Sequence, residues 1–141
     1  EHALTAAVLC FPASWTLTEK LGRPLVAVHA PVPDYAPHLA ARVQRLLDGL
    51  RPVEEGGRIL MRMNALPYRR ADLFHPRREA AGRETDRGEG PFLRIERQCL
   101  RKLPRTGAIA FSIHTTVIDR ATMSPAEAAA FESHLAAAPP S

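Results

Sequence analysis

The chain has 141 residues, with 45% hydrophobic and 24% charged side chains, the composition of one ordinary globular domain. Its net charge of +4 comes from 19 Lys and Arg against 15 Asp and Glu. These are scattered rather than gathered in a basic stripe with aromatic residues, which argues against nucleic-acid binding. No run of about 18 apolar residues exists, which excludes a membrane-spanning helix.

The two cysteines, Cys10 and Cys99, lie far apart and form no C-x-x-C pair. This spacing excludes a zinc ribbon and a thioredoxin-type redox site. We expect two buried free thiols in a reducing, cytoplasmic compartment. Because the first residue is Glu1 and no signal peptide is visible, we expect residues 1–141 to form a single domain taken from a longer protein.

Three short elements are predicted in the N-terminal part. The apolar run Ala6–Phe11 is typical of a buried strand. Thr16–Glu19 has the capping-box spacing and Gly22 a stop signal, so a helix of about one turn is expected there. Pro24–Ala30 forms a short stiff apolar segment that cannot continue as a helix past Pro31.

The middle of the chain predicts a long helix, a strand and a loop. Asp34–Leu50 carries leucines and a valine at helical spacing, with Asp34 as its cap and Pro37 in its first turn. We expect that apolar stripe to pack on a sheet. Gly57–Tyr68 alternates as a strand does, and Arg69–Gly90 is a polar segment that we expect to be a mobile loop.

Phe92–Val117 predicts two long strands joined by a tight turn at Leu103–Gly107, where Pro and Gly set the corners. A second capping box at Ser124–Glu127 opens a C-terminal helix. The fold class is therefore α+β: an antiparallel β-sheet in a meander with helices packed on one face.

His29 is the histidine whose surroundings stand out, because it lies between apolar residues and prolines at the end of a stiff segment. One interpretation is a buried histidine bonded to a backbone carbonyl, and on a helix it shares a face with Leu25. The other is a metal ligand or acid/base group held by rigid surroundings.

Arg94, Glu96 and Gln98 fall on one face of the first hairpin strand. They either face water, with a surface ion pair of little energetic value, or line a polar pocket. A carboxylate in such a pocket can hold a cation or move a proton.

Two long motifs carry a resemblance to a known family. C-F-P-x-S-W-x-L-x-E-K-L-G-x-P-L-x-x-x-H-x-P-V-P spans Cys10–Pro33, and L-R-x-E-R-Q-x-L-x-K-L-P-x-T-G-A spans Leu93–Ala108. With Asp72–Pro76, they resemble the family related to haem-dependent oxidative N-demethylase. The resemblance implies a PAS-like fold and a monooxygenase that converts a small secondary amine such as dimethylamine to methylamine and formaldehyde. It also implies haem b in this chain, with flavin, iron–sulfur cluster and NAD(P)H on reductase partner subunits.

The resemblance also suggests roles for individual residues. His29 matches the histidine of the first motif and is expected to be the axial ligand of the haem iron. Glu96 is expected to be catalytic by binding an alkylammonium group, and Arg94 to bind a haem propionate. Gln98 and Asn64 complete the expected cofactor-binding set.

The sequence departs from the family pattern at three positions. Ala65, His114 and Thr116 stand where the family tends to have Trp, Arg and Tyr. Because these residues line the sheet, an altered site is a second hypothesis: a non-catalytic PAS-like domain that binds haem or another small ligand as a sensor.

Overall fold

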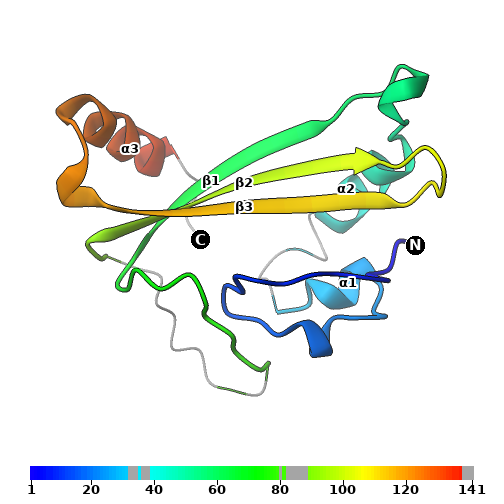
Figure 1. Ribbon diagram of the computed structural model, residues 1–141, viewed down its shortest axis with the longest axis horizontal. Coiled ribbons are helices and arrows are strands. Elements are labelled where there is room, and N and C mark those ends of the chain that lie inside the picture. The colour runs from blue at the N-terminus through cyan, green and yellow to red at the C-terminus, as the bar shows by residue number, and fades with distance from the viewer. Residues whose placement is uncertain (32–34, 36–38, 80, 82–88, 138–141) are drawn as a thin grey trace.

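The computed structural model describes residues 1–31, 35, 39–79, 81 and 89–137 (Figure 1). The elements follow one another along the chain as η1 (Leu17–Glu19), α1 (Leu25–Val28), α2 (Ala40–Asp48), η3 (Val53–Glu55), β1 (Leu60–Tyr68), β2 (Phe92–Lys102), β3 (Ile109–Asp119), η4 (Arg120–Thr122) and α3 (Pro125–Ala137). In the part of the chain described, no helix is long and apolar enough to cross a membrane.

The three strands form an antiparallel sheet in the order β1-β2-β3. In its register Asn64 lies opposite Glu96, and Glu96 opposite Thr115. The hairpin turn closes with Leu103 N–H donating to the Ala108 carbonyl (2.8 Å), and Gly107 takes φ 68°, which favours glycine. The predicted α+β class with an antiparallel sheet is confirmed, and it is compatible with the expected PAS-like fold.

The sheet has two faces, because side chains alternate along each strand and directly paired residues point to the same side. Both faces are mixed: Val117 and Ile113 lie on the side of Arg94 and Gln98, and Arg97 and His114 lie on the other side. We name each face by its residues on β2. We call the side of Arg94, Glu96 and Gln98 the polar face. The other side, with Leu93 and Ile95 on β2, is the apolar face. The alternation predicted for the strands places these residues correctly.

Helix α3 lies against the apolar face. Its Phe131 is buried, and it borders an open groove together with Leu93 and Ile95. The helix begins at the predicted capping box: Ser124 Oγ donates to Glu127 Oε2 (2.7 Å), and Glu127 N–H donates back to Ser124 Oγ (3.3 Å). Helix α1 lies on the opposite side of the strands, so the helices do not all cover one face as expected (Figure 1).

The polar face also has a cover, formed by irregular N-terminal chain and by residues 69–79. Figure 1 shows the N-terminal segment with α1 on the opposite side of the strands from α3. Ala13 and His75 form a parallel bridge between these two covering segments. Residues 69–79 are thus held against the N-terminal segment, and the remainder of the loop predicted over 69–90 lies partly outside the described residues.

The strand predicted at residues 6–11 is wrong. Val8 is 92% exposed, Phe11 and Cys10 are exposed, and the run takes no strand conformation. The Phe11 carbonyl accepts a hydrogen bond from the Arg94 side chain of β2. A strand requires a partner backbone beside it, and a side-chain contact does not supply one. The buried thiol predicted at Cys10 is wrong for the same reason.

Helix α2 is shorter than the helix predicted over residues 34–50. It starts at Ala40, and the expected cap Asp34 and Pro37 lie outside the described residues. Leu47 and Leu50 are buried, whereas Leu39 and Leu46 are exposed, so only part of the predicted stripe packs.

Candidate functional site

The Arg94 side chain is a buried junction on the polar face. Only 2% of it is exposed. Its guanidinium donates to Glu96 Oε1 (3.2 Å) and to the carbonyls of Leu73 (3.2 Å) and Phe11 (3.0 Å). It also lies over the Tyr68 ring, 5.7 Å from the centroid. Arg94 therefore ties three distant segments together, a use of its donors that sequence spacing did not predict.

Glu96 is held from both sides by its neighbours on the strand. Arg94 Nε donates to Oε1, and Gln98 Nε2 donates to Oε2 (3.2 Å). The glutamate side chain is 17% exposed, so the carboxylate is mostly withdrawn from water but still reachable. The structure therefore brings Arg94, Glu96 and Gln98 together and places Asn64 across from Glu96 on β1. The water-facing interpretation of this strand face is wrong.

His29 lies at the end of α1, where the helix stops before Pro31. Its Nδ1 is 2.9 Å from the Leu25 carbonyl oxygen, and its ring stacks on Tyr35 with centroids 4.2 Å apart and planes 14° apart. Burial raises the pKa of the Tyr35 hydroxyl. Within the described part of the chain, these contacts belong to α1 and Tyr35, and His29 makes no hydrogen bond to the Arg94 cluster.

The His29 geometry bears on both interpretations of that residue. The predicted bond to a backbone carbonyl is confirmed, but the side chain is half-buried rather than buried. Because a carbonyl oxygen can only accept, Nδ1 carries the proton. That bond leaves the lone pair on Nε2, the tautomer in which histidine ligates a metal. The ring therefore offers a nitrogen lone pair of the kind that ligates metal ions. Elsewhere among described residues, no group of three His, Cys, Asp or Glu side chains is placed to hold a metal ion.

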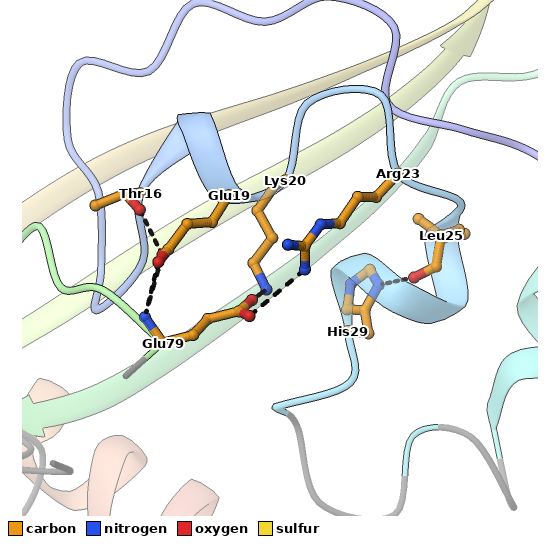
Figure 2. A network of polar contacts seen from close by, with 7 residues as sticks. All are labelled: Thr16, Glu19, Lys20, Arg23, Leu25, His29 and Glu79. Atoms are coloured by element: carbon orange, nitrogen blue, oxygen red, sulfur yellow. Dashed lines mark hydrogen bonds and ion pairs between the residues drawn. The ribbon is translucent and has the colours of Figure 1, made fainter. Parts of the chain in front are cut away.

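A polar network that sequence reasoning missed joins η1 to residue 79 (Figure 2). Lys20, with 5% of its side chain exposed, is paired with Glu79, and Arg23 lies 3.5 Å from the same carboxylate. Glu79 N–H also donates to Glu19 (3.1 Å), which accepts from Thr16 Oγ1 (2.6 Å). The hydrogen bond from Lys20 lowers the pKa of Glu79.

This network clamps the segment around Glu79 onto the N-terminal segment, next to the α1 helix that carries His29 (Figure 2). One sequence signal points to it: Lys20 is one of only two lysines in an arginine-rich chain. Its partner, 59 residues away, has no such signal.

The three departures from the family pattern lie away from Glu96. Ala65 pairs with Ile95, Ile95 with Thr116, and His114 with Arg97, so all three share the apolar face. They therefore do not line the Arg94–Glu96–Gln98 cluster.

Fold and site define an α+β domain with a carboxylate held on one sheet face and a stacked histidine in the segment that covers that face. The family model described as haem-dependent oxidative N-demethylase, alpha subunit-like, matches residues 1–138. The chain belongs to this family. No curated protein is matched by its sequence.

Proposed function

We propose that this domain binds haem through His29 and holds a small secondary ammonium ion at Glu96 for oxidative N-demethylation. The observation that carries the proposal is the His29 Nδ1 bond to the Leu25 carbonyl, which leaves Nε2 free to ligate iron. The family match supplies the cofactor class. When bound, haem would supply oxygen activation, with electrons from reductase partners that carry flavin and an iron–sulfur cluster.

The residues of the chain have separate tasks in this proposal. Tyr35 stacks on the His29 ring and restricts its rotation. Arg94 and Gln98 each donate to one oxygen of Glu96, so the carboxylate is fixed in place. Each carboxylate oxygen keeps a second lone pair that can accept an ammonium N–H. Glu96 is then the catalytic residue that binds the substrate.

Arg94 contributes mainly by position. Its guanidinium is committed to Glu96 and to two backbone carbonyls, which supports a positioning role over the propionate-binding role implied by the resemblance.

Haem titration tests the ligand assignment. The chain should develop a Soret band with haem, and His29→Ala should lose the band or shift it. His114→Ala is the matched control, because His114 is exposed on the other sheet face. A Soret band that is unchanged in His29→Ala would remove His29 from the role, and no band in any variant would refute haem binding.

Dimethylamine titration of the haem-loaded domain tests Glu96. The amine should perturb the haem spectrum, and Glu96→Gln should weaken the apparent affinity by about tenfold, because a charge-assisted hydrogen bond is lost. Glu132→Gln, an exposed carboxylate on α3, should leave the affinity unchanged. Equal affinities in Glu96→Gln and the parent would contradict substrate binding at Glu96.

A non-catalytic ligand-binding domain is the second candidate. One observation favours it: Arg94, Glu96 and Gln98 satisfy one another, as a purely structural cluster also does. Haem binding without amine turnover in the presence of a competent reductase would support it.

A further inference from the structure

An open groove of about 380 Å³, called the cavity below, lies on the apolar face between α3 and the sheet. This volume is in the range of about 300–1,000 Å³ that small-molecule sites occupy. Its lining is mostly apolar and includes Met63, Ala65, Leu93, Ile95, Met123 and Phe131. Asn64 also borders it. The site lies across the sheet from Glu96.

The helix wall of this cavity is formed by one face of α3. Glu127, Ala130, Phe131 and His134 recur at the spacing of a single helical face, and all four border the cavity. Phe131 is buried, yet Met63 opposite remains 57% exposed. The helix therefore touches the sheet at one anchor and leaves apolar surface uncovered beside it.

Charge at the cavity comes from Glu127. Its Oε2 accepts hydrogen bonds from the backbone N–H (2.8 Å) and the hydroxyl (2.7 Å) of Ser124, so the capping box fixes the carboxylate beside the cavity. Among the described residues no hydrogen bond is made to Oε1, which a ligand can therefore use. These Ser124 bonds lower the pKa of Glu127. Arg120 stacks over Phe131, but its charge is offset by Glu132 at 2.6 Å.

We propose that this cavity binds an alkylammonium ion, with its hydrocarbon chain among the methionines and its ammonium group at Glu127. Transfer of the hydrocarbon part from water to the apolar lining favours binding. The ammonium group donates a hydrogen bond to Glu127 Oε1, while Ser124 holds Oε2. This site rests on neither haem nor Glu96, because Glu96 is on the other side of the sheet, although Asn64, which pairs with Glu96, also borders the cavity.

The three methionines of the chain make a direct test. With ¹³Cε-labelled methionine, Met63 and Met123 report from the cavity walls. Met61 is the internal control, because it lies two residues from Met63 on the same sheet face, is 60% exposed and does not border the cavity. Single Met→Leu variants assign the three signals.

Hexylamine, hexan-1-ol and hexanoate are the probes, at about pH 8, above the range in which histidines ordinarily titrate. Hexylamine should give saturable shifts of Met63 and Met123 and leave Met61 nearly unchanged. The affinity for hexylamine should exceed that for hexanoate about two- to fivefold, as expected for an ion pair with an exposed carboxylate. Glu127→Gln keeps the capping box and should remove this preference.

Filling the cavity provides the matched pair of variants. Ala130→Leu should weaken hexylamine binding at least about fivefold, whereas Ala129→Leu, its neighbour outside the cavity lining, should not. Ala65→Val fills the site from the sheet side if Ala130→Leu disturbs α3. Glu96→Gln should leave all the shifts intact, which separates this site from the proposed catalytic one.

Four outcomes would overturn the proposal: equal shifts of Met61, no saturation, tighter binding of hexanoate, or equal weakening by Ala129→Leu and Ala130→Leu. Methionine shifts that depend on protein concentration without ligand would show instead that a second copy of the chain covers this face.

Discussion

The polar and apolar faces of the sheet are held to the rest of the chain by different forces. On the polar face, Arg94 joins β2 to two backbone carbonyls by hydrogen bonds that need a fixed geometry. On the apolar face, Phe131 anchors α3 by burial, which has no direction, and a cavity remains beside it. The polar face is suited to fixing a carboxylate, and the apolar face to accepting ligands of variable shape.

Arg94→Met, on the polar face, should cause the largest loss of folding stability. Substitution removes a buried charge and leaves the Phe11 and Leu73 carbonyls and the Glu96 carboxylate short of donors. The free energy of unfolding should fall by about 3–5 kcal/mol in urea denaturation. Arg97→Met, the exposed neighbour on the other face, should change it by less than about 0.5 kcal/mol. Similar losses in the two variants would show that the hydrogen bonds of Arg94 do not contribute to stability beyond those of an exposed arginine.

Phe131→Ala, on the apolar face, should cause a smaller loss of folding stability than Arg94→Met. The anchor of α3 disappears, and the expected cost is about 3 kcal/mol, measured in the same way. Haem affinity at His29 should stay unchanged, because α3 is on the opposite side of the sheet. A parallel loss of haem binding would show that the two faces are coupled.

The smallest expected effect is on the acid dependence of stability, through the Lys20–Glu79 pair that holds the cover of the polar face. The folded-state pKa of Glu79 is lowered below its ordinary value of 4.5, first by the Lys20 hydrogen bond. The stabilisation by the Lys20–Glu79 pair is therefore complete above about pH 4.5. It is lost as the pH falls through the lower pKa of Glu79 in the folded state. Glu79→Gln should show less loss of stability between about pH 5 and 3 than the parent, and Glu132→Gln should not. Identical acid profiles of Glu79→Gln and the parent would exclude this contribution.

Local patterns in the sequence predict the strands and the nearest-neighbour part of the site. The period-two alternation of Phe92–Val117 places Arg94, Glu96 and Gln98 together, because that arrangement depends on one strand alone. The capping box at Ser124 is likewise local and forms. At Thr16 the hydroxyl contacts the Glu19 side chain but caps no backbone N–H, so the capping box predicted there is wrong. His29 meets the Leu25 carbonyl because one turn of helix separates them.

The contacts that depend on the tertiary fold have no local pattern. The Lys20–Glu79 pair spans 59 residues, and the Arg94 bond to Phe11 spans 83. The run at residues 6–11 is apolar like a strand, but its conformation depends on whether a partner strand lies beside it. The face on which Ala65 lies also requires the pairing register, which periodicity within one strand does not give.

The acceptors that bind Arg94 are main-chain oxygens, and this has a consequence for how the sequence can vary. Every amino acid carries a carbonyl, so positions 11 and 73 can change their side chains without losing these hydrogen bonds. Position 94 has no such freedom, because lysine lacks the planar fork that reaches several oxygens at once. A scan of all substitutions should therefore find a sharply intolerant residue 94 beside two permissive contacts, with no covariation among the three.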